Sequence, residues 1–162
     1  MTARIHIRPA KTITKDSGWK NGSVPKTHAP FFKFPYKLHT NWFWREATLN
    51  HTVNPSLEYR LLVMLRLDKP NYKAWLSVKT EEGYTIVNRY ELHNGHGTLH
   101  CHFICGAERF PIGEIDPENC YTVPKHSRKK KGDSVESLTL VSAWHMALKF
   151  YRIGTSDRGS LL

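Results

Sequence analysis

The alternation of apolar and polar side chains predicts four strands in the middle of the chain. Short segments rich in β-branched and aromatic residues follow one another there, separated by turns that contain Asp, Asn, Pro or Gly. The segments are 58–67, 73–79, 84–92 and 98–105. Strands with turns at this spacing are typical of an antiparallel meander. The first segment has a second interpretation, because Asn54-Pro55-Ser56 also resembles a helix start.

A helix is predicted near the C-terminus. Apolar residues recur there at the spacing of one helical face, namely Leu140, Trp144, Ala147 and Tyr151. Asp133 with Glu136 fits a capping box ahead of this stripe, and Gly154 follows it as a stop signal. The sequence therefore predicts an α+β fold, in which an antiparallel sheet of about four strands carries a C-terminal helix on one face.

The first 40 residues have a different character. Residues 9–30 are rich in Pro, Gly, Ser, Thr and Lys and show little periodicity, whereas Arg4–Arg8 alternates like a short edge strand. We therefore expect a basic N-terminal arm over residues 1–40 and a single α+β domain over residues 41–162.

Composition narrows the class of protein. Of the 162 residues 40% are hydrophobic, which is enough to bury a sizeable core. The longest aliphatic run is Leu61–Leu65, far short of the roughly 20 residues that span a bilayer. The start of the chain has no apolar signal region, and three cysteines do not make a disulfide framework. These features predict a reduced cytoplasmic protein without a membrane partner.

The charge favours a nucleic acid, either DNA or RNA, as the partner. The net charge is +10, and residues 1–45 contain nine basic residues and a single acid, Asp16. Phosphate backbones are common cellular polyanions. Aromatic and basic residues also interleave over 31–37 and 42–45, as in proteins that bind single strands. Core packing is nevertheless the better explanation for Trp42 and Trp44. The candidate contacts are Lys33, Lys37, Arg45, Arg128, Lys129, Lys130 and Lys131.

The most informative segment holds four of the ten histidines: His93, His96, His100 and His102. If 98–105 is a strand, His100 and His102 lie on the same face, since side chains alternate. Two imidazoles on one face can hold a divalent metal, with His93 or His96 as a third ligand. Such a site leaves positions open for water or a phosphate oxygen.

Three other interpretations of this segment stay open. The histidines can act without a metal as general acid and base in phosphodiester cleavage. His96, Cys101, Cys105 and Cys120 can together hold a structural zinc, or the histidines can be ordinary polar residues of a sheet. Outside the cluster, Glu91 could orient a ligand histidine, Arg89 could neutralise a phosphate, and His145 on the predicted helix could supply an acid or base.

The segment His100-Cys101-His102 resembles the hallmark of the HUH endonucleases, which include relaxases, rolling-circle initiators and single-strand transposases. His93, seven positions upstream, stands where many relaxases carry a further metal ligand. The resemblance implies a divalent metal (Mn, Mg or Zn) held by His93, His100 and His102. It also implies a tyrosine nucleophile on a helix, for which Tyr151 is the candidate.

Together these observations predict a small histidine-dependent endonuclease, in a defence, toxin or mobile-element setting. Its candidate catalytic residues are His96, Tyr151 and His145, and its candidate metal ligands are His93, His100 and His102. The alternative is a non-catalytic basic module that binds nucleic acid, or an inhibitor that binds a protein partner. In that case the histidines and cysteines are structural.

Overall fold

The computed structural model describes residues 4–22, 24, 41–68, 71–81, 83–93, 100–103, 120–122 and 138–154. At positions 4, 5, 93, 100–103 and 120–122 this description covers the backbone only. The elements in chain order are α1 (Arg4–Ile7), β1 (Lys11–Asp16), β2 (Lys20–Asn21), β3 (Trp42–His51), β4 (Glu58–Arg66), β5 (Asn71–Thr80), β6 (Gly83–His93), β7 (His100–Phe103), β8 (Cys120–Thr122), α2 (Leu140–Phe150) and β9 (Ile153–Gly154).

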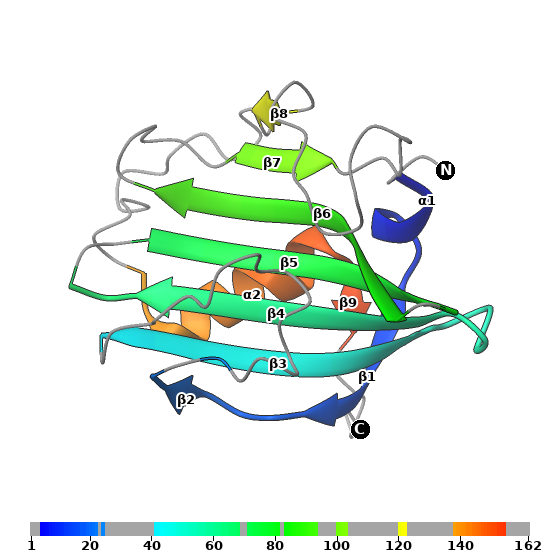
Figure 1. Ribbon diagram of the computed structural model, residues 1–162, viewed down its shortest axis with the longest axis horizontal. Coiled ribbons are helices and arrows are strands. Elements are labelled where there is room, and N and C mark those ends of the chain that lie inside the picture. The colour runs from blue at the N-terminus through cyan, green and yellow to red at the C-terminus, as the bar shows by residue number, and fades with distance from the viewer. Residues whose placement is uncertain are drawn as a thin grey trace, which may run out of the picture.

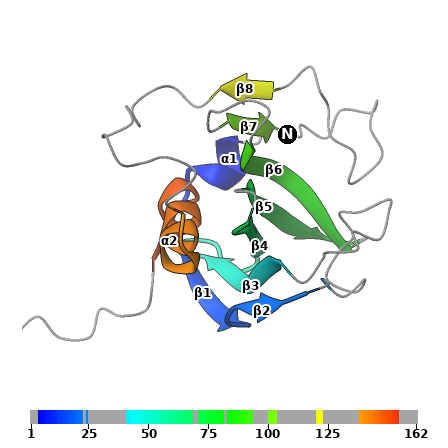
Figure 2. The same cartoon turned by 90° about the vertical axis from the view of Figure 1, so that its left-hand side faces the viewer.

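The strands form one curled sheet with α2 packed on one side of it (Figures 1 and 2). Within the described part of the chain its order is β8-β7-β6-β5-β4-β3-β1-β9, and β2 pairs with β3. Strands β3 to β8 follow one another as an antiparallel meander. The predicted sheet with a C-terminal helix is therefore found. The expectation of about four strands, all antiparallel, is wrong, because further strands join at both edges and β9 runs parallel to β1.

Burial on both faces explains why 58–66 is a strand and not a helix. Leu61, Val63 and Leu65 pack into the core under α2, whereas Leu62 and Met64 belong to a second cluster on the opposite face. A strand that is covered on both faces has a continuous apolar sequence, which by itself cannot be distinguished from a buried helix. The helical interpretation of this segment is therefore wrong.

Helix α2 packs on the sheet through Ala143, Trp144, Ala147 and Leu148. Its N-cap is Thr139, whose hydroxyl accepts a hydrogen bond from the Ser142 backbone N–H, while the Thr139 N–H bonds the Ser142 hydroxyl. The helix thus begins later than the predicted capping box, whose residues lie outside the described part of the chain.

The expected stop signal at the C-terminal end of α2 also differs. Gly154 does not end the helix, because it pairs with Thr12 in β9. Helix α2 ends at the C-cap Tyr151, and Arg152 then takes the left-handed conformation, with φ 54°.

The N-terminal region contributes to the sheet. Residues 4–7 are helical, so the predicted edge strand over 4–8 is wrong. Residues 11–16, expected in a loop or arm, form β1 and pair with β3. Where β1 ends, the Ser17 N–H bonds the Glu46 carbonyl at 2.9 Å and the Ser17 hydroxyl accepts the Glu46 N–H at 2.9 Å. These bonds hold the start of the chain against the sheet.

The opposite face of the sheet has its own apolar cluster. Its buried members are Trp42, Trp44, Leu62, Met64, Trp75 and Ile86. The expected core packing of Trp42 and Trp44 is confirmed, since these rings are only 7% and 3% exposed. None of the described helices is long and apolar enough to cross a membrane.

Candidate active site on the β6–β7 sheet face

The backbone register brings the candidate metal ligands to one face of the sheet. His100 pairs with Glu91 and His102 pairs with Arg89 in the β6–β7 ladder. Residues paired directly across antiparallel strands lie on the same face. His93 is two positions beyond Glu91 on β6 and therefore belongs to this face as well. Three histidine positions, one carboxylate and one guanidinium thus share a small area.

This area lies on the face that α2 leaves uncovered. Tyr90 and Leu92 alternate with Arg89 and Glu91 on β6, and both belong to the core under α2. The side chains at 89 and 91 consequently lie on the other face, next to Trp75, which pairs with Arg89. The candidate chemistry thus lies on the face opposite α2, which also carries the second apolar cluster.

Glu91 and Arg89 form a buried ion pair. Glu91 Oε1 lies 2.9 Å from Arg89 Nη2, and the two side chains are 3% and 16% exposed. Burying a carboxylate costs several kcal/mol unless a cation or hydrogen-bond donors compensate it. The pairing therefore compensates the buried Glu91 carboxylate at the register position beside His100.

Lys73 is a further basic residue on this face that the sequence analysis missed. It pairs with Glu91 in the β5–β6 ladder and is half-buried. Glu91 therefore lies between Lys73 on one neighbouring strand and His100 on the other. The only sequence signal was a lysine between Tyr72 and Ala74 in an apolar strand, which is also the pattern of an ordinary polar strand position.

At the other end of the same face, polar and charged side chains from several strands pair with one another. The Glu58 carboxylate accepts a short hydrogen bond from the Tyr84 hydroxyl and lies 3.3 Å from Lys79 Nζ. The Arg60 guanidinium stacks 4.0 Å from the Tyr84 ring centroid and pairs with Glu46 at 3.1 Å. Burial, followed by the bond to Glu58, raises the pKa of Tyr84 to about 12. These groups pair with one another at the end of the face away from the histidine positions.

The ligand set for a metal is only partly described. Among the described side chains, no group of three His, Cys, Asp or Glu residues could hold a metal ion. The side chains of His93, His100 and His102 are not among them, and His96 lies outside the described residues together with Cys105. The donor types at these register positions, imidazole and carboxylate, suit zinc or manganese.

Tyr151 lies away from the histidine positions. Its side chain is fully buried on the α2 side of the sheet. Its hydroxyl oxygen is 2.9 Å from the Ala74 carbonyl and 2.8 Å from Asn88 Oδ1. The structure thus gives this hydroxyl a structural role within the core. His145 lies on the exposed side of the same helix, so neither residue joins the β6–β7 face.

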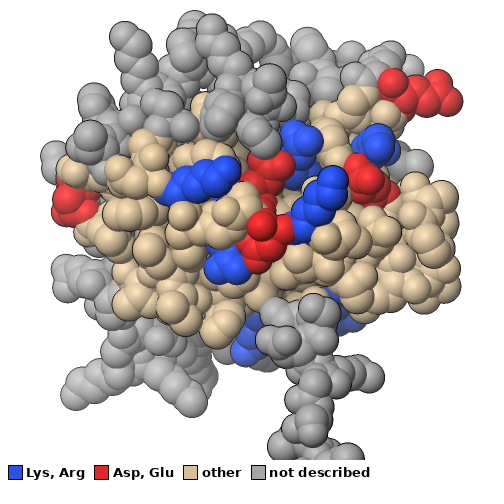
Figure 3. All heavy atoms as spheres, turned by 90° about the horizontal axis from the view of Figure 1, so that it is seen from below, with Lys and Arg blue, Asp and Glu red and all other residues tan. Residues whose placement is uncertain are grey.

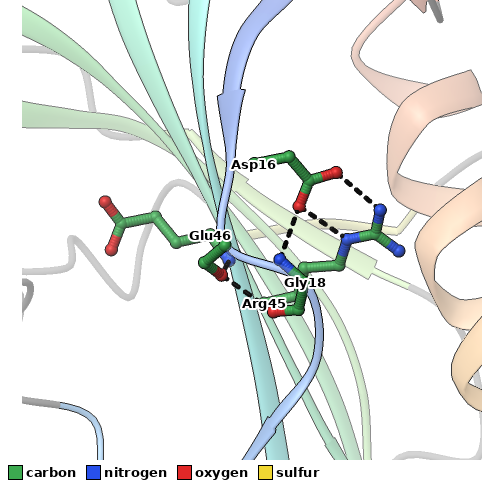
Figure 4. Close-up of polar contacts among 5 residues, drawn as sticks. Asp16, Gly18, Arg45 and Glu46 are labelled. Atoms are coloured by element: carbon green, nitrogen blue, oxygen red, sulfur yellow. Dashed lines mark hydrogen bonds and ion pairs between the residues drawn. The ribbon is translucent and has the colours of Figure 1, made fainter.

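The candidate nucleic-acid contacts are mostly outside the described residues, namely Lys33, Lys37, Arg128, Lys129, Lys130 and Lys131. Arg45 is described and is engaged within the fold. Its guanidinium forms two hydrogen bonds to Asp16, of 2.9 and 2.5 Å (Figure 4). It also lies 4.0 Å from the Trp144 ring centroid. These bonds hold the pKa of the Asp16 carboxyl below its usual value.

On the face seen in Figure 3, the Lys and Arg side chains alternate with those of Asp and Glu and do not gather into a patch of one sign. Of the predicted nucleic-acid contacts, all but Arg45 lie outside the described residues. Comparison with protein-family models, curated proteins and solved structures finds no significant match to this chain.

Proposed function

We propose that this chain is a histidine-dependent endonuclease that hydrolyses phosphodiester bonds at the β6–β7 sheet face. One observation carries the proposal: the register sets His100 opposite Glu91 and His102 opposite Arg89. Histidine, carboxylate and guanidinium are the groups that phosphodiester cleavage uses for proton transfer and charge stabilisation. The net charge of +10 agrees with a polyanionic substrate.

In the proposed reaction the cationic residues bind the substrate. Arg89 and Lys73 hold the scissile phosphate and stabilise the negative charge that grows on its oxygens. Glu91 already pairs with Arg89, and it orients the imidazole at position 100 by accepting its N–H.

The histidines then transfer protons. One imidazole accepts a proton from the attacking water, which forms the new P–O bond. A second imidazole, for which His96 is the candidate, gives a proton to the leaving oxygen as the old P–O bond breaks. In the alternative form of the reaction, a divalent metal held by His93, His100 and His102 would supply Lewis-acid activation of the phosphate and of the attacking water, and these three imidazoles would be ligands and not proton-transfer groups.

Tyr151 has no part in this proposal. Its hydroxyl is in the core on the other side of the sheet, bonded to Ala74 and Asn88. A water nucleophile is therefore preferred to the covalent tyrosine intermediate that the HUH resemblance implies.

A cleavage assay on labelled single- and double-stranded DNA and RNA tests the proposal. It compares the parent protein, the double variant His100→Ala/His102→Ala and the matched control His145→Ala, with chelator and with added Mn²⁺. The double variant should lose at least 100-fold in cleavage rate and still bind the strand by fluorescence anisotropy, while the control cleaves normally.

Two results would contradict the proposal. If no substrate is cleaved under any metal condition but the strand is bound, the chain is the non-catalytic binding module. If the double variant and the control cleave equally, the active site lies elsewhere.

A further inference from the structure

The start of β1 contains a lysine that is fully buried. Lys11 is 0% exposed. Its Nζ lies 2.9 Å from the Pro9 carbonyl, 3.2 Å from that of Tyr151 and 3.3 Å from that of Ile7. An ammonium group has three hydrogens, so these three carbonyl oxygens can satisfy it completely. One of them belongs to the C-cap of α2, where the helix dipole favours a positive charge.

The same lysine lies where the two ends of the described chain meet. Its backbone N–H donates to the Arg152 carbonyl at 3.1 Å, and it pairs with Ile153 in the parallel β1–β9 ladder. Nearby, the Arg152 guanidinium donates to the Arg8 carbonyl at 3.2 Å, and the Ala10 carbonyl accepts the Thr52 N–H at 3.1 Å. We call residues 4–11 the N-terminal segment.

A histidine on α1 packs beside this lysine. His6 is buried, and its Nδ1 lies 3.1 Å from the Tyr59 hydroxyl. The His6 and Tyr59 rings meet edge to face at 5.7 Å, and Lys11 Nζ lies 5.2 Å from the same Tyr59 ring centroid. The side chains of His6 and Lys11 therefore both pack against Tyr59 on β4.

The described side chains that lower the pKa of His6 and Lys11 through their charge are all basic. Lys11 faces Arg152, which follows α2. His6 faces Lys11 and, with a smaller effect, His51 at the end of β3. Tyr59 is uncharged at neutral pH, since burial raises its pKa further. A second proton bound here therefore meets like charge at close range, which is costly in a buried site.

We propose that the N-terminal segment is a proton-controlled latch, which is closed on Tyr59 while His6 is neutral and opens when His6 takes up a proton beside Lys11. This inference stands apart from the proposed nuclease function. It rests on the buried cluster of His6, Lys11 and Tyr59 and on the main-chain bonds around it.

The titration behaviour supports the direction of the switch. Burial, and then the charge of Lys11, lowers the pKa of His6 below its usual value of 6.5. A group with a lowered pKa binds its proton less well in the closed state, so closing releases the proton. The closed state is thus fully stabilised above pH 6.5 and weakens as the pH falls below it. Lys11 stays protonated throughout this range, because burial and Arg152 lower its pKa only to about 8.

Hydrogen exchange on the full chain tests the latch. The reporters are the backbone amides of Lys11 and Thr52, which donate to Arg152 and Ala10 across the latch. The reference amides lie in β4 and β5. After correction for the intrinsic exchange rate, the reporters should lose protection between pH 7.5 and 5.5 while the reference amides keep theirs.

Two variants distinguish opening of the N-terminal segment through His6 from a loss of stability at low pH that does not depend on His6. His6→Asn keeps an acceptor for the Tyr59 hydroxyl without a titrating group, so its reporters should be equally protected at both pH values. His145→Asn, on the exposed side of α2, should behave like the parent protein.

Equal protection of the parent reporters at both pH values would overturn the proposal, as would the same loss in His6→Asn. If His6→Asn does not fold, the imidazole of His6 is titrated by NMR in the parent protein. A midpoint below 6.5 supports the latch, and a midpoint at or above 6.5 contradicts it.

Discussion

Glu91 on β6 lies directly opposite His100 on β7. The Glu91 carboxylate also forms an ion pair of 2.9 Å with Arg89, and Arg89 lies opposite His102. Two neighbouring register pairs thus combine a buried acid, a guanidinium and two histidine positions. This arrangement is the basis of the proposed site.

Removing only the acidic partner of the buried Glu91–Arg89 pair should destabilise the fold. Glu91→Gln leaves the Arg89 charge largely buried without its carboxylate, so the free energy of unfolding should fall by about 3 kcal/mol. Urea denaturation measures this loss. The matched control is Glu81→Gln, whose side chain is exposed and whose substitution should be neutral. An equal effect of the two substitutions would show that the pair is not buried in solution.

Tyr151→Phe separates a structural hydroxyl from a catalytic one. The variant removes the hydroxyl that bonds Ala74 and Asn88 in the core, so stability should fall by about 1 kcal/mol. Cleavage by the folded variant should be unchanged. A variant that folds normally but no longer cleaves would restore the tyrosine nucleophile implied by the HUH resemblance.

Lys11 should make the protein more stable at alkaline pH. Its pKa is lowered from 10.5 to about 8 by burial, so the unfolded chain binds this proton more tightly than the folded chain does. The free energy of unfolding should therefore rise by about 2 kcal/mol between pH 7.5 and 9.5. Lys11→Met should lack this increase, and Lys149→Met, on the exposed side of α2, should keep it. A parallel pH profile in Lys11→Met and the parent would contradict the assignment.

The Asp16 carboxylate should contribute little to the free energy of unfolding, and only when the pH is high enough to keep it ionised. Its hydrogen bonds to Arg45 lower its pKa, so the contribution is present at neutral pH and is lost as the pH falls through that lowered value. Because the pair is partly exposed, Asp16→Asn should cost about 0.5 kcal/mol at pH 7. The difference from the parent should shrink as the pH falls below 3.8, the ordinary pKa of an Asp carboxyl. A difference that stays constant as the pH is lowered further would mean that the side chain acts through packing and not through charge.

The sequence predicts the elements whose signals are local. Strands β4 to β6 are predicted by the alternation of apolar and polar residues and by the turn residues between them. His100 and His102 are predicted to share a face because side chains alternate between the two faces along a strand. Strand β1 was missed because Lys11–Asp16 is mostly polar, and it forms by pairing with β3 some 35 positions away. The start of α2 was missed because Thr139 and Ser142 form its capping box without an acidic residue.

The neighbours of the histidines could not be predicted in the same way. Which residue of β6 lies opposite His100 depends on the register, and a shift of one residue would have put Glu91 on the other face. The position of Tyr151 was equally ambiguous, since a tyrosine on the apolar stripe of a helix fits both the core and a catalytic role. Its hydrogen bonds to Ala74 and Asn88 decide for the core.

In the proposed function the β6–β7 face, and not the helix-covered face, receives the nucleic acid. Amide chemical shifts recorded while a short oligonucleotide is added test this most directly. We predict changes at Lys73, Arg89 and Glu91 and along β7, with little change at His145 and Lys149 on α2. Changes confined to α2 and β1, with none on β6 and β7, would show that the nucleic acid does not bind the β6–β7 face.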